Sequence, residues 1–454
     1  MPQLQFGLSS YERTEGDLPG LPVINQYGED TASEGIVLQS RPGLSDRSAD
    51  MGSGPVEQLF LRDLVLSSAL YGVSGGTLYN GTAAIGVING SGFCSIAGNE
   101  IGLMATRGQS LYFYDGSTLS AVAFPDSADV AHVSVGGSRY WMVRKDTGKI
   151  YWTSALESTV DALDFATAES LPDRALQTLW IDGSLIIFGS ESVEFWQQTG
   201  NADLPITPLI NMVLEKGLKA TGCACAFGSS FAFVTNDNQV CLQNENNIVS
   251  NAGLEARIAA SASVRLFPFQ LGGDEFLCLR LDTETQVYNR RTGLWSEFQS
   301  YGQTNWLPQC FAAGVFGSGV DGKTLEWGAG YQDAVTAANP NGVLERRFRA
   351  GFPLNSGGLN VTNLQLRANA GQTPFLTGDY AAPQVEMRVS RDGGQTWGAW
   401  RAAELGAQGD YRQLTQWRAM GLASRPGFLC EFRCTDPVPF RASAALINEN
   451  YGGR

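Results

Sequence analysis

The stretch RYWMVRKDTGKIYWTS, residues 139–154, contains two short apolar runs separated by a polar turn. Aromatic and β-branched residues dominate both runs, and these residue types favour strands. Asp146 to Gly148 supply the polar residues and the glycine of a tight chain reversal. The stretch therefore predicts an antiparallel β-hairpin.

Six further stretches repeat this pattern. They are GTLYNGTAAIGVI, SLYFYDGSTLSAVAF, SLIIFGSESVEFWQ, SFAFVTNDNQVCL, EFLCLRLDTETQVYN and AAGVFGSGVDGKTLEW. The seven turns, from Asn80-Gly81 to Asp321-Gly322, are separated by 35, 31, 43, 46, 46 and 39 residues. Spacings near ~40 residues are typical of four-stranded propeller blades. We therefore predict a β-propeller of six or seven blades over residues 60–335, although a string of small sandwiches would give similar hairpins.

The last hairpin contains GSGVDGKT, residues 317–324, which fits the G-x-x-x-x-G-K-[ST] pattern of a phosphate-binding P-loop. A P-loop needs a parallel strand before it and a helix after it, whose first N–H groups hold the phosphates. Here the sequence continues as a strand from Thr324, and Asp321 places a negative charge inside the loop. We interpret the stretch as a turn and predict no nucleotide cofactor.

The segments on either side of the predicted propeller differ from it in composition. Residues 1–59 are rich in Gly, Pro, Ser and Asp and predict an extended N-terminal arm with loops. After a polar linker, alternating segments such as QVEMRVS and FLCEFRC predict a C-terminal β-sandwich over residues 341–450. The predicted fold class is all-β, a propeller followed by a sandwich.

Charge is unevenly distributed between these parts. The chain has 31 basic and 45 acidic residues, a net charge of −14. From residue 341 onward there are 13 Arg, no Lys and 9 acids, so residues 1–340 carry −18. An acidic surface opposes tight, sequence-independent DNA binding. No secretory signal and no apolar run of the ~20 residues that a spanning helix needs is evident, so we expect a soluble protein made in the cytoplasm.

The stretch SRDGGQTW, residues 390–397, resembles the Asp box, S-x-D-x-G-x-T-W, of sialidases and other glycan-binding propellers. The matching residues are Ser390, Asp392, Gly394, Thr396 and Trp397. Asp392 can accept hydrogen bonds from turn N–H groups, and Trp397 can pack under the hairpin. Sialidase chemistry would need an Arg cluster, a Tyr nucleophile and an acid at blade ends. One box outside the propeller repeats therefore predicts a structural hairpin.

Other chemistry is poorly supported by the sequence. The chain has a single histidine, His132, which argues against His-dependent catalysis and imidazole metal sites. The eight cysteines lack zinc spacing, and Cys223 and Cys225 lie on one predicted strand, so we expect buried, reduced thiols and no metal. Arg346, Arg347 and Arg349 form a cationic cluster where the second domain begins. This cluster is a candidate docking face for a neighbouring subunit or another acidic partner surface.

Several segments, taken in order, resemble the tail hub proteins of short-tailed bacteriophages, also called packaged-DNA stabilisation, head-closure or tail nozzle proteins. They are RPGL at 41–44, GPV at 54–56, LYGVSGGTLYNG at 70–81, LIIFGSESVEFWQQTGNADLPITPL at 185–209, EKG at 215–217, YNRRTGLWSEF at 288–298 and FRCTDPVPFRASAALI at 432–447. The fragments span nearly the whole chain. The chain lacks long insertions between blades that could serve as a platform for tailspikes.

The resemblance implies a non-enzymatic virion protein that is assembled in the bacterial host cytoplasm. Family members form a hexameric ring on the portal-adaptor ring, with a channel closed by a tail needle, plug or tip. They retain packaged DNA, give it a conduit for ejection without tight binding, and help to hold tailspikes or fibres. The alternative is a tail-associated glycan-binding or glycan-cleaving propeller. Several Asp boxes and an Arg triad at blade ends would favour that alternative, and the sequence has neither.

Overall fold

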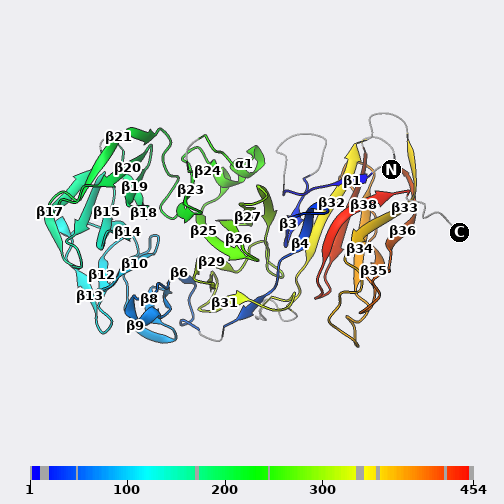
Figure 1. Cartoon of the computed structure of the whole chain (residues 1–454), viewed down its shortest axis with the longest axis horizontal. Coiled ribbons are helices and arrows are strands. Elements are labelled where there is room, and N and C mark those ends of the chain that lie inside the picture. Colours follow the sequence, from blue (N-terminus) through cyan, green and yellow to red (C-terminus); the bar gives the residue numbers. More distant parts are fainter. Residues whose placement is uncertain are drawn as a thin grey trace.

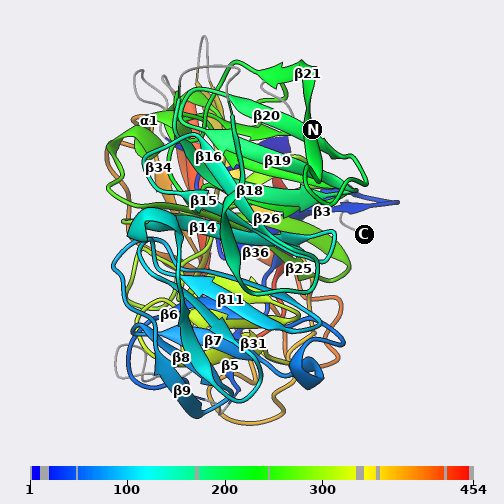
Figure 2. The same ribbon diagram turned by 90° about the vertical axis from the view of Figure 1, so that its left-hand side faces the viewer.

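The structure is a computed structural model that describes residues 3–10, 20–47, 50–168, 173–243, 246–333, 342–353, 358–423 and 427–448. These residues form a β-propeller with a β-sandwich beside its rim (Figure 1), so that the sandwich lies behind the propeller in Figure 2. The predicted all-β class is confirmed. In the described part of the chain, α1 (Ala252–Ala260) is the one α-helix, and no helix is long and apolar enough to cross a membrane.

The described residues form seven blades, which follow one another around the ring in sequence order (Figure 1). The innermost strands are β6 (Val56–Phe60), β10 (Ser95–Asn99), β14 (Val130–Gly136), β18 (Ala175–Ile181), β22 (Ala224–Phe227), β25 (Val264–Leu271) and β29 (Pro308–Ala312). The second strands are β7 (Tyr71–Ser74), β11 (Gly102–Thr106), β15 (Arg139–Arg144), β19 (Ser184–Gly189), β23 (Ser230–Val234), β26 (Asp274–Leu281) and β30 (Val315–Ser318). The third strands are β8 (Thr77–Asn80), β12 (Leu111–Tyr114), β16 (Lys149–Thr153), β20 (Val193–Gln198), β24 (Val240–Leu242), β27 (Thr285–Asn289) and β31 (Thr324–Trp327).

The outermost strand of each blade is less uniform. Four blades end in β9 (Ala83–Val87), β13 (Leu119–Val122), β17 (Val160–Thr167) and β21 (Ile206–Leu214), and the sixth ends in β28 (Leu294–Glu297). In the fifth blade a bridge between Cys241 and Ile248 takes this place. In the seventh blade the outer strand is β5 (Leu44–Asp46), which comes from the N-terminal segment and pairs with β31. The N-terminal segment thus completes the last blade.

Apolar side chains fill the wedges between neighbouring blades, and one such cluster closes the ring. Met51, which precedes the first blade, and Val56 and Leu59 of its innermost strand pack against Cys310 and Val315 of the seventh blade. The two blades that meet here are far apart in the sequence, so this contact converts a row of blades into a closed propeller.

All seven predicted hairpins are present, but their turns occupy two different positions in the blades. Asn80-Gly81 and Asp115-Gly116 connect third to fourth strands, whereas the other five turns connect second to third strands. The short spacing of 31 residues falls where the series changes position. The P-loop-like stretch joins antiparallel β30 and β31, with Gly317 opposite Thr324, and is a hairpin as predicted.

The sandwich has two facing sheets around one core. The first contains β32 (Arg346–Pro353), β37 (Gly427–Cys434), β34 (Gln384–Ser390) and β35 (Arg401–Glu404). The second contains β3 (Gln26–Thr31), β4 (Gly35–Ser40), β38 (Arg441–Ile447), β33 (Leu359–Ala368) and β36 (Thr415–Ala423). Phe348, Trp417, Phe432 and Phe440 are buried between the sheets.

The N-terminal segment differs from the extended arm that its composition predicts. Besides β3, β4 and β5, it forms β1 (Gln3–Phe6), which pairs with both β32 and β38, and β2 (Val23–Ile24). Ile24 pairs in parallel with Glu297 of the sixth blade and antiparallel with Arg347 of the sandwich. One hydrogen-bonded sheet therefore runs from the propeller into the sandwich.

Candidate functional site

A buried polar cluster joins the two domains where the N-terminal segment, the propeller and the sandwich meet. Arg41 and Asp333 form an ion pair with both side chains fully buried, and each guanidinium Nη donates to a carboxylate oxygen at 2.8 Å. The remaining donors of Arg41 bind the Asn25 side chain at 2.9 Å and the carbonyls of Pro42 and Gln299 at 3.0 Å. All five N–H groups of this guanidinium are thus satisfied.

The same cluster reaches the sandwich through Asn25, which is itself buried. Its side-chain amide donates to the carbonyl of Glu345 at 2.8 Å, just before β32. Its side-chain oxygen accepts from the backbone N–H of Gln299 at 3.0 Å. Asp333 also accepts from the N–H of Leu44 at 3.1 Å. The cluster therefore fixes the start of the sandwich against the last two blades.

The three arginines of the predicted docking face do not lie on one surface, because Arg346 is buried. Arg346 is fully buried and donates to the carbonyls of Cys434 at 3.2 Å and Val438 at 2.7 Å, so it cannot meet a partner surface. Side chains alternate along a strand, which places Arg347 and Arg349 on the opposite face. Arg347 remains partly exposed beside Glu345, at 3.5 Å.

Arg349 belongs to a stack of alternating arginine and tryptophan side chains on that outer face. The guanidinium carbons of Arg349 and Arg388 lie 4.9 and 4.8 Å from the ring centre of Trp397. Arg388 and Arg433 lie 4.5 and 4.3 Å from the ring of Trp400. We call these five residues the Arg–Trp stack. Cation–π contacts of this kind stabilise by about 0.5–2 kcal/mol each.

Carboxylates hold the arginines of the Arg–Trp stack in place. Glu431, which is fully buried, accepts from Arg349 Nε at 2.9 Å through one oxygen and from Arg388 through the other. Glu386 binds Arg433 at 2.6 Å at the other end of the stack. The arginines are therefore held within this chain and are not free cations.

The Asp-box-like hairpin lies at the end of β34, next to the Arg–Trp stack. Ser390 Oγ donates to Asp392 at 2.7 Å and accepts from the N–H of Gly394 at the same distance. The Thr396 hydroxyl donates to Asp392 Oδ2, and both oxygens of Asp392 accept from the N–H of Thr396 at 2.9 Å. The hydroxyl bond first, and then the N–H bonds, hold the pKa of the Asp392 carboxyl well below its usual value. Trp397 contacts Arg349 and Arg388, where the sequence suggested packing beneath its own hairpin.

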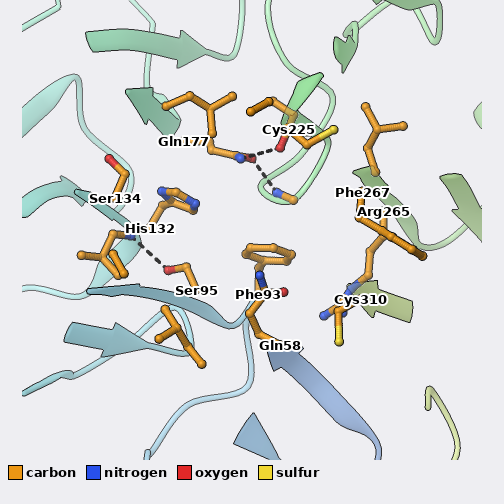
Figure 3. A pocket seen from close by; sticks show the side chains of 18 of the residues that line it. Gln58, Phe93, Ser95, His132, Ser134, Gln177, Cys225, Arg265, Phe267 and Cys310 are labelled. Carbon is orange, nitrogen blue, oxygen red and sulfur yellow. Dashed lines mark hydrogen bonds between the residues drawn. The ribbon is translucent and has the colours of Figure 1, made fainter. Parts of the chain in front are cut away.

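A cavity of about 330 Å³ lies on the propeller axis and is lined by the innermost strand of every blade. Figure 3 shows Phe93, His132 and Arg265 pointing into it from different blades. Phe93 stacks on His132 with ring centres 6.3 Å apart, and Arg265 lies 5.2 Å from the Phe93 ring. The Gln177 side chain bridges the Ala224 carbonyl at 2.7 Å and the Gly222 N–H at 2.9 Å.

His132 is only 6% exposed, and its Nδ1 has no hydrogen-bond partner among the described residues. Burial lowers the pKa of the imidazole to about 3, because removal from water disfavours the charged form. His132 is therefore neutral in the folded protein at neutral pH.

Acid should destabilise the protein through His132. The unfolded chain binds a proton on this residue below pH ~6.5, whereas the folded chain does so only near 3, so stability is lost as the pH falls through this window. The expected loss from this one group is about 1.4 kcal/mol per pH unit. Urea unfolding between pH 7 and 4 should show a shallower pH dependence for His132→Gln than for the native chain. Parallel curves would contradict the prediction.

The structure confirms the prediction about the cysteines but does not test the prediction that the chain binds no metal. All eight cysteines are buried and none forms a disulfide, as predicted, and burial raises the pKa of the Cys223 thiol to about 12. Within the described ranges, no group of three or more His, Cys, Asp or Glu side chains could hold a metal ion.

This molecule is a two-domain all-β protein. A seven-bladed propeller is followed by a sandwich, and hydrogen-bonded strands join the sandwich to the edge of the propeller. Comparison with known families matches both parts in order. The family model described as "Bacteriophage P22 Gp10, beta-propeller" matches residues 64–307, and "Bacteriophage P22 Gp10, beta-sandwich" matches residues 346–449. The chain belongs to the bacteriophage P22 Gp10 family.

A curated relative agrees with this assignment. "Tail hub protein gp10" of Salmonella phage P22 is 26% identical over 185 residues, which cover 37% of this chain and 39% of the relative. The match thus spans well under half of the relative's length. With the two family matches, it identifies the chain as a structural protein of a phage tail.

Solved structures show resemblance in fold alone. The BBS1N structure in complex with ARL6DN covers 64% of this chain and 98% of its own, at 9% identity and a TM-score of 0.43. YCF48 from Cyanidioschyzon merolae covers 63% and 98%, at 12% identity and a TM-score of 0.40. Scores this low carry no argument about function.

Proposed function

We propose that six copies of this chain form the tail hub ring below the portal-adaptor ring. The ring closes the DNA exit channel, retains the packaged genome and later provides the conduit for its ejection. The observation that carries the proposal is the match of both domains, in order, to the P22 Gp10 family, of which one relative is a tail hub protein. The role is non-enzymatic, within a virion assembled in the host cytoplasm.

The geometry of the propeller supports a conduit formed between subunits. The axial cavity of about 330 Å³ is the size of a pocket for a small molecule, and Phe93 lies across it, so a DNA duplex cannot thread one propeller. The net charge of −18 on residues 1–340 favours passage of DNA without tight binding.

The junction between the domains suits a part that bears load. The sheet that continues from β28 through β2 to β32 and the Arg41–Asp333 pair hold the sandwich at a fixed angle to the propeller. Partners in the proposed assembly are the adaptor ring, a tail needle or plug, and tailspikes or fibres. Arg347, partly exposed at the junction, is the member of the sequence-predicted cluster that remains a candidate contact.

Native mass spectrometry of the purified chain, alone and mixed with the portal-adaptor ring of its own phage, tests the proposal. We expect a species of six times the 48.7 kDa chain mass, either free or bound to the adaptor. A chain that stays monomeric in both samples would overturn it.

A charge reversal tests the candidate contact separately. Arg347→Glu should reduce the hexameric fraction, because it places a negative charge at a site proposed to meet an acidic surface. Arg412→Glu makes the same change at an exposed position in the loop that follows β35 and serves as the control. Equal hexamer fractions for the two variants would exclude Arg347 from the interface.

A further inference from the structure

The axial cavity contains a cation without a carboxylate partner. Among the described residues, Arg265 forms no ion pair, and its one hydrogen bond is from Nη1 to the backbone carbonyl of Glu57 at 2.9 Å. The carboxylate of Glu57 is engaged elsewhere, since both its oxygens accept from Arg107 at 2.8 Å. The remaining N–H groups of Arg265 are therefore available to a ligand.

His132 supplies a second polar group that nothing in the described chain satisfies. Its Nδ1 is buried without a partner, and the side chain points into the cavity opposite Arg265, with the Phe93 ring between them (Figure 3). A neutral imidazole carries one donor and one acceptor. A buried polar side chain without a partner is costly, and a ligand that binds beside it would remove that cost.

Phe93 separates this cavity from a second one. The second cavity, of about 260 Å³, is lined by Phe93 together with Lys145, Arg174 and Lys219, with Asp146 as the acid among the lining residues. Lys145 and Arg174 have exposed carboxylate neighbours at 3.7 and 3.4 Å, and such pairs are weak. Three cations thus line a cavity that shares the Phe93 wall with the axial cavity, in a part of the chain that is otherwise acidic.

The Phe93 ring is held in place by a glycine. Gly222 has a positive φ of 92°, and a side chain built on it would begin 2.4 Å from the Phe93 ring. The close approach of this backbone fixes the wall between the two cavities. The sandwich lies beside the propeller and not over its axis (Figure 1), so it does not cover this route.

We propose that the propeller axis is a binding site for a small oxyanion, of the phosphate or carboxylate class. The anion approaches past Lys145, Arg174 and Lys219 and is held by Arg265 beside His132. N–H donors recognise oxyanions through charge-assisted hydrogen bonds, and an anion neutralises the half-buried guanidinium. The cavity has the volume of a pocket for a small molecule.

Isothermal titration calorimetry on the full chain, with inorganic phosphate and separately with acetate, tests this site. One saturable site is expected for at least one probe, and the probe that binds identifies the class of oxyanion. Arg265→Gln should weaken binding about tenfold or more, because a hydrogen bond to a charged group is lost. Arg290→Gln is the matched control, since Arg290 pairs with Glu275 at the surface, and it should bind as the native chain does.

Two results would overturn the proposal. The first is the absence of a saturable heat with both probes, and the second is native affinity in Arg265→Gln. Because Arg265→Gln could disturb the fold, Lys145→Gln tests the same route from an exposed position. Lys145→Gln should weaken anion binding by about threefold, because it removes a positive charge from the proposed approach to the cavity. Unchanged affinity in Lys145→Gln, with Arg265→Gln unfolded, would also count against the site.

Discussion

Replacing Arg41 with methionine is expected to lower the free energy of unfolding by about 3–5 kcal/mol. The variant leaves the Asp333 carboxylate fully buried without its cation, removes one of the two donors to the Asn25 side-chain oxygen, and removes the side-chain donor to the Gln299 carbonyl. Because these groups join the last two blades to the sandwich, we also expect the two domains to unfold in separate transitions. Urea unfolding followed by circular dichroism measures both effects.

A matched replacement separates the burial of this pair from charge removal in general. Arg174 pairs with Asp146 at 3.4 Å, but the two side chains are 58% and 69% exposed, so Arg174→Met should cost no more than about 1 kcal/mol. The double variant Arg41→Met/Asp333→Leu should recover part of the loss, because it leaves no uncompensated charge. An Arg41→Met protein as stable as Arg174→Met would show that the pair does not hold the junction.

The propeller was predictable because each blade is built from neighbours in the sequence. Residues 139–154 pair with one another as β15 and β16, so their pattern alone predicts the hairpin. The position of a hairpin within its blade is harder to infer, because second-to-third and third-to-fourth turns use the same residue types. The identity of the outermost strand of blade seven could not be inferred from local pattern, since β5 lies far from β31 in the sequence.

The site residues that sequence reasoning missed depend on contacts between distant segments. Arg41 lies in the RPGL segment that supports the family resemblance, yet its partner Asp333 is 292 residues away. The Arg346 cluster looked like a surface feature because three cations stand close together in the sequence. Strand alternation turns Arg346 inward and its neighbours outward, so the cluster does not exist as one face.

Part of the Arg–Trp stack can be recognised in the sequence pattern. Trp397 and Trp400 are three residues apart, and Arg388 and Arg433 alternate with apolar residues in QVEMRVS and FLCEFRC. That alternation predicts the arginines on one face of their strands. It does not predict that the segment after the hairpin folds back over that face, which depends on the Asp392 turn.

Replacing Glu431 with glutamine is expected to destabilise the protein by about 2–4 kcal/mol. Glu431 is fully buried and compensates Arg349 and Arg388, which are 18% and 24% exposed, so its loss leaves two like charges close together and poorly solvated. The partial exposure of the arginines keeps the effect below that of Arg41→Met. The near-ultraviolet circular dichroism of tryptophan should change as well, because Arg388 contacts both Trp397 and Trp400.

Glu386→Gln provides the control, because it removes a carboxylate from the same stack at a more exposed place. Glu386 and Arg433 are 34% and 28% exposed, so this change should cost no more than about 1 kcal/mol. The near-ultraviolet signal distinguishes the two variants: Glu431→Gln should alter the surroundings of both tryptophans, whereas Glu386→Gln affects Arg433 and Trp400 alone. If both variants lose equal stability, burial of Glu431 does not set the strength of the stack, and the outer face of the sandwich depends on cation–π contacts instead.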